Sequence, residues 1–338
     1  MQSFVEPFLK PRRISYSLHS LGPRRFILAG KVYRRVDFDL QNDRSLSLKC
    51  SFFECDQTSP SRCVVYCHGN CGNRMDSLEI IDFVLPEGMT LCAFDFSGSG
   101  QSEGEYVSFG YYEQRDIDCV VQYLLGHHQV TDIVLWGRSM GAVAALLYAS
   151  NHHFVRCVVA DSPFVNFKDL CLKVIESYHI PRFLSGYIVD RLRAAVLEKA
   201  GFLIEDVDTL RAVSQCSMPL IFIHSAQDRL VDIDQSRRLF EVCRSESTFL
   251  EVQGSHNAMR AEQVVKKAVE EVLHHLAAKQ AIEEETAPTV VRLPLRVKEF
   301  IQRERPAHSR NETRSWGNTY PEQLFKQALH ELQRSPIS

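Results

Sequence analysis

The chain has 338 residues, of which 45% are hydrophobic and 24% are charged, so it is long and apolar enough to bury the core of a globular protein. Its formal net charge of −3 gives no reason to expect nucleic acid as a partner. No segment reaches the roughly 18 consecutive apolar residues of a membrane-spanning helix, and we see no signal-peptide pattern at the N-terminus. The 11 cysteines are odd in number and scattered, which favours reduced thiols in the cytoplasm over a disulfide framework.

The first part of the chain is rich in basic residues. Residues 1–35 contain eight lysines and arginines, with Phe4 and Phe8 among them, against a single acid, Glu6. We expect residues 1–33 to form a basic arm that packs on the domain that follows. The alternative is weak contact of this arm with an anionic membrane surface, which would make the protein a peripheral membrane protein.

Residues 34–279 alternate short apolar runs with segments of helix length, a pattern typical of a parallel sheet with helices on both faces. The sequence predicts an α/β fold whose mostly parallel sheet has eight strands, at 35–40, 46–53, 63–67, 89–95, 131–136, 155–160, 219–224 and 246–252. The first two strands alternate apolar and polar residues, as an antiparallel edge does, whereas several later ones are almost wholly apolar. Helices are predicted at 74–85, 111–126, 141–150, 234–243 and 258–279.

Two segments lie outside this alternation. Residues 164–215, between the sixth and seventh strands, indicate helices without a strand, and Leu170, Val174 and Tyr178 recur there at helical spacing. We expect these helices to form a lid over the carboxyl ends of the strands, where open α/β sheets place their sites. Residues 280–338 combine an acidic run with several prolines and are predicted to be a partly disordered tail.

The segment Gly137-Arg138-Ser139-Met140-Gly141 predicts a nucleophilic serine. It follows an apolar strand and precedes a predicted helix, so we expect Ser139 on a sharp turn that exposes its hydroxyl. The two glycines would remove side chains that collide at such a turn. A seryl hydroxyl is a poor nucleophile unless a base takes its proton, so this role requires a base elsewhere in the chain. The alternative to a nucleophile is a structural serine in a tight turn.

The acid and the base are expected at the carboxyl ends of later strands. Asp228 follows the strand at 219–224, and His256 lies on the loop between the last strand and the last helix. The chain order Ser139, Asp228, His256 is the order of nucleophile, acid and base in strand–turn–helix hydrolases.

Other residues compete for these roles. Asp161 and Asp232 are the alternatives to Asp228, and each is more simply explained as a turn or cap residue. His224 lies inside a predicted strand, where a core role is expected. The paired histidines lie near predicted helix ends, where polar or cationic residues are common; they are His127 and His128, His152 and His153, and His274 and His275.

An acyl-transfer intermediate needs hydrogen-bond donors for its oxyanion. We expect one donor to be the backbone N–H of Met140 at a helix N-terminus. The other is expected to be the backbone N–H of Asn70, in the loop after the strand at 63–67. His68 with Cys67 and Cys71 offers at most three metal ligands on one short turn, so no metal is expected.

The glycine-rich loop at 95–102 resembles a phosphate-binding loop. It lacks the lysine of the G-x-x-x-x-G-K-[ST] pattern, so we expect a tight turn beside the site rather than nucleotide binding. No cofactor is therefore predicted.

Several segments together resemble the α/β-hydrolase superfamily. They are Tyr66-Cys67-His68-Gly69-Asn70, Phe94-Asp95-Phe96-Ser97-Gly98-Ser99-Gly100, Trp136-Gly137-Arg138-Ser139-Met140-Gly141-Ala142 and Asp161-Ser162-Pro163-Phe164. More narrowly, residues 4–279 resemble plant and protist α/β-hydrolase domain-containing proteins in the serine-aminopeptidase-like branch. The resemblance implies the α/β-hydrolase fold and carries the nucleophile, acid and base onto Ser139, Asp228 and His256.

The sequence thus predicts a serine hydrolase that cleaves a carboxylic ester or thioester of a small molecule or an acylated protein through an acyl-enzyme. The apolar stripe of the expected lid favours hydrophobic acyl groups. Two alternatives are a protein depalmitoylating thioesterase at a membrane surface and a non-catalytic interaction protein that retains the fold. The pattern makes no prediction of the oligomeric state.

Overall fold

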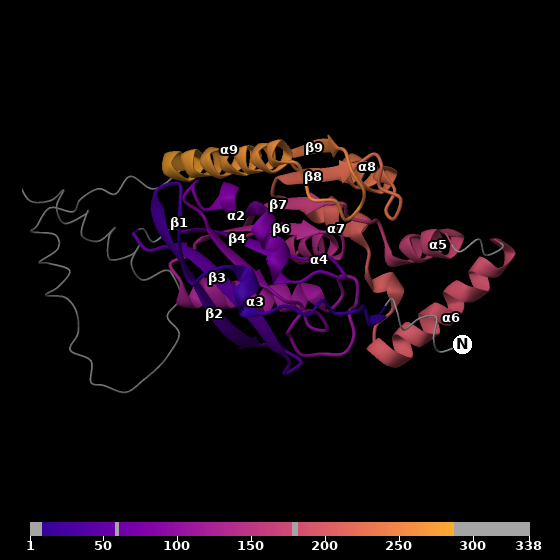
Figure 1. Cartoon of the computed structure of the whole chain (residues 1–338). Coiled ribbons are helices and arrows are strands. Elements are labelled where there is room, and N and C mark those ends of the chain that lie inside the picture. The colour runs from indigo at the N-terminus through magenta and orange to yellow at the C-terminus, as the bar shows by residue number, and fades with distance from the viewer. Residues whose placement is uncertain (1–8, 58–60, 178–181, 287–338) are drawn as a thin grey trace, which may run out of the picture. The chain divides into compact units, whose positions relative to one another are not determined.

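The chain is described from a computed structural model over residues 9–57, 61–177 and 182–286 (Figure 1). It divides into two compact units, residues 1–281 and 282–338. The tail predicted from residue 280 lies outside the described residues from residue 287 onward. Residues 280–286 continue the last helix, which is longer than predicted.

Among the described residues of the first unit, one sheet has nine strands, in the order β1-β2-β3-β5-β4-β6-β7-β8-β9. Strands β1 to β3 and the β3–β5 pair are antiparallel, and every other pair is parallel. The prediction of a mostly parallel sheet with an antiparallel edge is therefore confirmed. The strands are β1 (Arg25–Leu28), β2 (Lys31–Gln41), β3 (Ser47–Cys55), β4 (Arg62–Cys67), β5 (Thr90–Phe94), β6 (Asp132–Arg138), β7 (Val155–Asp161), β8 (Leu220–Ser225) and β9 (Ser247–Val252).

The ninth strand, β1, was not expected from the sequence. It forms a hairpin with β2 in which Leu28 pairs with Lys31, so the loop contains only Ala29 and Gly30. Both loop residues have positive φ, 47° and 76°, which is the backbone of a tight turn whose twist matches the strands. Residues 25–33, predicted as part of the basic arm, thus belong to the sheet. The Ala-Gly pair gives a weaker hairpin signal than Asn-Gly or Asp-Gly.

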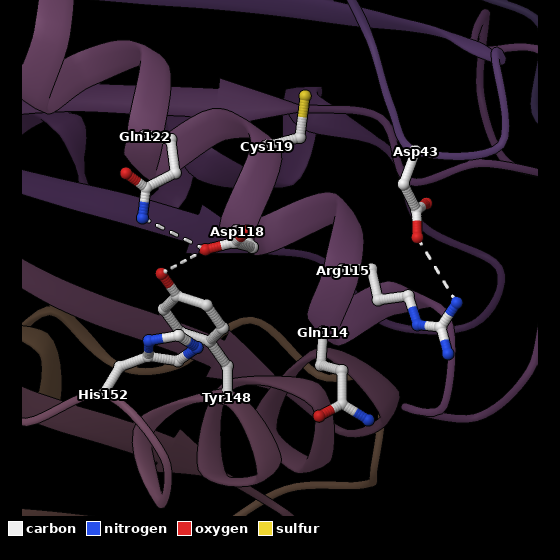
Figure 2. A pocket seen from close by; sticks show the side chains of 8 residues that line it. All are labelled: Asp43, Gln114, Arg115, Asp118, Cys119, Gln122, Tyr148 and His152. Atoms are coloured by element: carbon white, nitrogen blue, oxygen red, sulfur yellow. Dashed lines mark hydrogen bonds and ion pairs between the residues drawn. The ribbon is translucent and has the colours of Figure 1, made fainter.

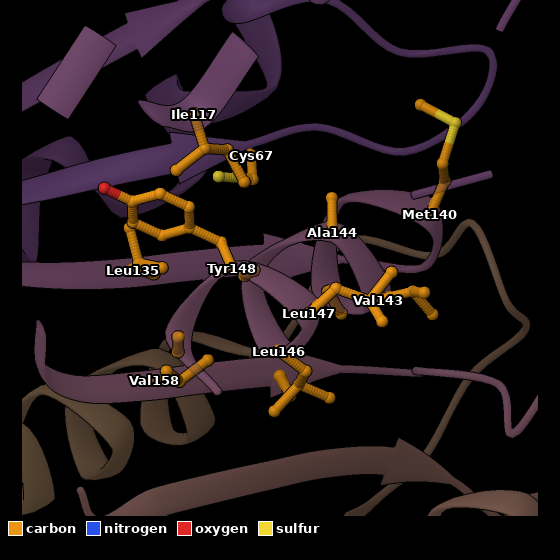
Figure 3. Close-up of a cluster of buried hydrophobic side chains, with 14 of the residues drawn as sticks. Cys67, Ile117, Leu135, Met140, Val143, Ala144, Leu146, Leu147, Tyr148 and Val158 are labelled. Carbon is orange, nitrogen blue, oxygen red and sulfur yellow. The ribbon is translucent and has the colours of Figure 1, made fainter. Parts of the chain in front are cut away.

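Two apolar cores cover the two faces of the sheet. Because side chains alternate along a strand, Val65 and Leu135 lie in one core while Val64 and Val134 lie in the other. The helices that pack on the first core include α3 (Glu113–His127), α4 (Met140–Ala149) and α8 (Ile233–Val242), and those on the second include α2 (Leu78–Val84) and α9 (Glu262–Thr286). Figure 3 shows part of the first core, where α4 is buried along its whole length.

The segment between β7 and β8 is helical, as the sequence predicts. It contains α5 (Phe167–Ser177), α6 (Arg182–Ala200), η4 (Ile204–Asp206) and α7 (Thr209–Gln215). Figure 1 shows α5 and α6 beyond the ends of the strands. Of the predicted stripe, Leu170 is buried, whereas the side chains of Val174 and Tyr178 lie outside the described residues. The lid function of this segment remains a prediction.

The N-terminal segment before the hairpin is bonded to the loop that follows β5. Leu9 is fully buried, and its carbonyl accepts the Val107 N–H at 2.8 Å. The Arg13 guanidinium donates to the carbonyl oxygens of Ser102, at 2.7 Å, and of Gly104. The described residues also include the short helices η2 (Leu18–Leu21) and η3 (Arg74–Ser77). Nowhere in the described parts of the chain is a helix long and apolar enough to cross a membrane.

Candidate active site

Ser139 lies on the turn between β6 and α4. Its φ of 51° and ψ of −116° are a strained backbone conformation for a residue other than glycine. The Ser139 N–H donates to the Asp161 carbonyl on the neighbouring strand at 2.7 Å, which holds this conformation in place. The turn therefore presents the side chain at the carboxyl end of the sheet, as predicted.

The two glycines flanking this turn are required by close backbone packing. A Cβ at Gly141 would lie 2.0 Å from the Cys67 carbonyl oxygen, and one at Gly137 would lie 2.4 Å from the Gly141 carbonyl oxygen. Real Cβ atoms do not approach backbone this closely. The predicted reason for the glycines is thus confirmed.

The structure brings the three predicted side chains into one chain of hydrogen bonds. The Ser139 Oγ lies 2.9 Å from His256 Nε2, and His256 Nδ1 lies 2.6 Å from Asp228 Oδ2. Asp228 follows β8 and His256 follows β9, so neighbouring parallel strands deliver them to the same edge of the sheet. The arrangement allows the imidazole to take the seryl proton while the carboxylate holds the opposite ring nitrogen.

The environment of Asp228 keeps its carboxyl group ionised. Burial by itself would raise the pKa of Asp228, but hydrogen bonds with His224 and His256, the charge of His256 and the Val231 N–H together hold that pKa well below its usual range. The second oxygen, Oδ1, accepts the backbone N–H groups of Leu230 and Val231, each at 2.9 Å. A fixed negative charge thus faces the His256 ring.

His224 contacts this carboxylate, which the sequence did not predict. It is fully buried, as expected for a core histidine, but its Nε2 lies 3.4 Å from Asp228 Oδ2 and 3.0 Å from the Val231 carbonyl. Its Nδ1 lies 2.6 Å from Ser236 Oγ. The sequence feature that could have indicated this contact is the position of His224 at the end of a strand, four residues before Asp228.

The two competing acids have other partners. Asp161 forms a two-bond ion pair with Arg260, with distances of 2.8 and 2.6 Å. Asp232 is the N-cap of α8 and accepts the Asp234 N–H at 3.1 Å, which is the cap role predicted for it.

The loop after β4 runs beside the serine. A Cβ at Gly69 would lie 3.7 Å from the Ser139 Cβ, and Asn70, whose N–H is one of the two predicted oxyanion donors, is the next residue. His68 fixes this loop, because its Nε2 accepts the Phe96 N–H at 3.0 Å and its Nδ1 lies 2.7 Å from the Gly69 carbonyl. Met140, the other predicted donor, is the first residue of α4, where helix N–H groups are free to bind an anion.

The glycine-rich loop after β5 encloses a carboxylate of the chain itself. Asp95 accepts the backbone N–H groups of Arg74 and Gln101, both at 2.8 Å, and the Tyr16 hydroxyl at 2.5 Å. A Cβ at Gly100 would lie 2.3 Å from the Asp95 carboxyl carbon. The loop is therefore a tight turn around Asp95.

A hollow of about 600 Å³ lies beside α3 and α4, and neither Ser139, Asp228 nor His256 lines it. Figure 2 shows the side chains that line it: Asp43, Gln114, Arg115, Asp118, Cys119, Gln122, Tyr148 and His152. Asp118 accepts the Tyr148 hydroxyl at 3.1 Å, and Arg115 donates to Asp43 at 3.3 Å. Arg115 and Asp43 thus pair with each other, whereas the Asp118 carboxylate is held by the neutral Tyr148 hydroxyl and Gln122 amide.

Known proteins resemble this chain in sequence and fold. A family model described as serine aminopeptidase, S33, matches residues 58–212. The chain is 28% identical over 220 residues to the Bacillus subtilis protein YqkD, a match that covers 63% of this chain and 71% of YqkD. It is 25% identical over 205 residues to the human protein ABHD12B, covering 58% of this chain and 54%, about half, of that protein. An esterase from Pyrococcus furiosus superposes with a TM-score of 0.60 at 21% identity, over 80% of this chain and 97% of the esterase.

The family match includes Ser139 but ends before Asp228 and His256. It agrees with the serine-aminopeptidase-like branch predicted from the motifs, whereas the narrower likeness to plant and protist members stays a prediction. The structure has the α/β-hydrolase fold, and in sequence the chain is similar to the serine aminopeptidase, S33, family.

Proposed function

We propose that this hydrolase of the α/β fold is a serine hydrolase that cleaves a carboxylic ester or thioester through an acyl-enzyme. The observation that carries the proposal is the unbroken chain of hydrogen bonds from Ser139 Oγ through His256 to Asp228, with distances of 2.9 and 2.6 Å. No further group is needed to activate the hydroxyl.

The proposed reaction has two halves. In the first, His256 Nε2 accepts the Ser139 proton as the oxygen attacks the acyl carbon, and the backbone N–H groups of Asn70 and Met140 bind the oxyanion. The imidazolium, stabilised by Asp228, then protonates the leaving alcohol or thiol. In the second half, His256 activates a water molecule that attacks the acyl-enzyme, and the carboxylic acid leaves with Ser139 restored.

Apolar side chains near the triad favour a hydrophobic acyl group. Met259, three residues after His256, is 77% exposed, and Leu230, two residues after Asp228, is 41% exposed. Exposed apolar side chains on the loops that carry the base and the acid favour an apolar substrate over a charged peptide.

The test combines active-site labelling with a substrate series. A fluorophosphonate probe should label the wild type and not Ser139→Ala, because the probe reacts only with an activated serine. Turnover of p-nitrophenyl esters and acyl thioesters should rise with acyl length from two carbons to a longer optimum. Labelling that survives Ser139→Ala would refute the nucleophile, and labelling without turnover of any ester or thioester would favour an amide substrate or a non-catalytic binding role.

A further inference from the structure

Four charged side chains form a network next to the triad: Glu79, Arg138, Asp161 and Arg260. Their exposed fractions are 11%, 13%, 4% and 3%, respectively. Two positive and two negative groups balance, so the network places no net charge inside the protein. None of the four was predicted to act in catalysis, although Asp161 competed for the role of the acid.

The network consists of two linked ion pairs. Arg260 donates from Nε and Nη2 to the two oxygens of Asp161, and Arg138 donates from Nη1 to Glu79 Oε2 at 3.0 Å. Glu79 Oε1 also accepts the backbone N–H of Arg260. The pairs are therefore joined to each other through Glu79.

On one side, the network is attached to the nucleophile. Arg138 directly precedes Ser139 in the chain. Asp161, the partner of Arg260, accepts the Ser139 N–H through its own carbonyl oxygen at 2.7 Å. Both ion pairs thus have one member bonded to the turn that presents the seryl hydroxyl.

On the other side, the network holds the loop that carries the base. Arg138 Nη2 donates to the carbonyl oxygens of His256, at 3.1 Å, and of Ala258, at 2.5 Å. Arg260 lies near the end of the same loop, which has no helix or strand between β9 and α9. Because no regular hydrogen-bond ladder fixes this loop, its distance from Ser139 depends on side-chain bonds. Ser225 and Gln227 bond to Gly254 early in the loop, whereas the Arg138 bonds lie at His256 itself and just after it.

We infer that Arg138 and Arg260 are positioning residues that hold the His256 imidazole at hydrogen-bond distance from the Ser139 hydroxyl. The inference rests on the proposed function. The two arginines act entirely through His256, so neither needs to touch the substrate. Misplacement of a catalytic group by about 1 Å costs on the order of 100-fold in rate, so loss of either arginine is expected to lower kcat far more than it changes KM.

The experiment compares Arg138→Gln and Arg260→Gln with the wild type, using p-nitrophenyl butyrate turnover, fluorophosphonate labelling rate and thermal unfolding. The matched control is Arg35→Gln. Arg35 is as buried as Arg260, at 3% exposure, and pairs with Asp37 at 2.9 Å, but it lies on β2 at the antiparallel side of the sheet. Arg138→Lys and Arg260→Lys test whether charge alone is sufficient.

We expect kcat and the labelling rate to fall about 100-fold in both glutamine variants, with KM changed less than about twofold. Arg35→Gln should lower the melting temperature by a similar amount with kcat unchanged. The lysine variants should recover only part of kcat, since a lysine cannot bridge two acceptors with fixed geometry. If Arg260→Gln does not fold, Asp161→Asn/Arg260→Gln removes both charges and is tested in its place.

The inference fails if the glutamine variants keep wild-type kcat while losing thermal stability as Arg35→Gln does, or if lysine restores kcat fully. Failure of the proposed function looks different, because the wild type would then not be labelled or Ser139→Ala would still be labelled. Normal labelling of the wild type, absent labelling of Ser139→Ala and unchanged rates in the arginine variants would overturn only the positioning role.

Discussion

Replacement of Asp228 by asparagine should abolish most of the activity through the tautomer of His256. Asp228 Oδ1 accepts two backbone N–H groups at 2.9 Å, so the remaining oxygen of an asparagine has to occupy this position. Its NH₂ group then faces His256 Nδ1, where Asp228 Oδ2 now lies at 2.6 Å. Two facing donors repel each other, so Nδ1 must lose its hydrogen and Nε2 must carry one.

An imidazole protonated at Nε2 cannot accept the Ser139 proton. The expected loss in kcat is about 10⁴-fold, the order found when the acid of a serine hydrolase triad is replaced by its amide. The opposite orientation of the amide is disfavoured, because its NH₂ would then face the N–H groups of Leu230 and Val231. The geometry of the site therefore fixes which tautomer the variant adopts.

The assay measures kcat and KM of Asp228→Asn with p-nitrophenyl butyrate, together with the labelling rate of Ser139. Asp232→Asn is the matched control, because Asp232 lies on the same segment, caps α8 and loses little as asparagine. A retained activity above about one tenth of wild type in Asp228→Asn would refute the assignment of the acid. Equal losses in both variants would point to disruption of the segment instead.

Three further predictions concern the scaffold and the arm. Gly141→Ala should lower the free energy of unfolding, measured by denaturant titration, by about 3 kcal/mol or more, because the alanine Cβ would overlap the Cys67 carbonyl. Gly126→Ala, where the space is open, should be neutral or stabilising in the same titration. Burial raises the pKa of Asp116 to about 6, above its unfolded value of about 3.9. The free energy of unfolding should therefore decrease as the pH rises from about 4 to 6, and Asp116→Asn should remove that slope in urea titrations. Arg12→Glu should leave sedimentation with phosphatidylserine vesicles unchanged if the arm packs on the domain, whereas weaker recovery would support the membrane-surface alternative.

The motif around Ser139 could be recognised in the sequence because all of its parts are contiguous. An apolar strand, two glycines around a serine and an apolar helix occupy residues 131–150, and each part has its own local signature. Asp228 and His256 were placed by chain order, because parallel strands deliver the loops that follow them to one edge of a sheet. Asp232 was likewise explained by a local rule, that of helix capping.

Only the tertiary structure showed the contacts that surround the triad. Arg260 bonds to Glu79, 181 residues earlier in the chain, and Arg138 bonds to the carbonyls of a loop 118 and 120 residues later. Such contacts depend on side-chain direction and on the packing of distant elements, neither of which leaves a periodic signal in the sequence. The same reason explains why His224 was assigned to the core: burial follows from a local pattern, but proximity to Asp228 does not.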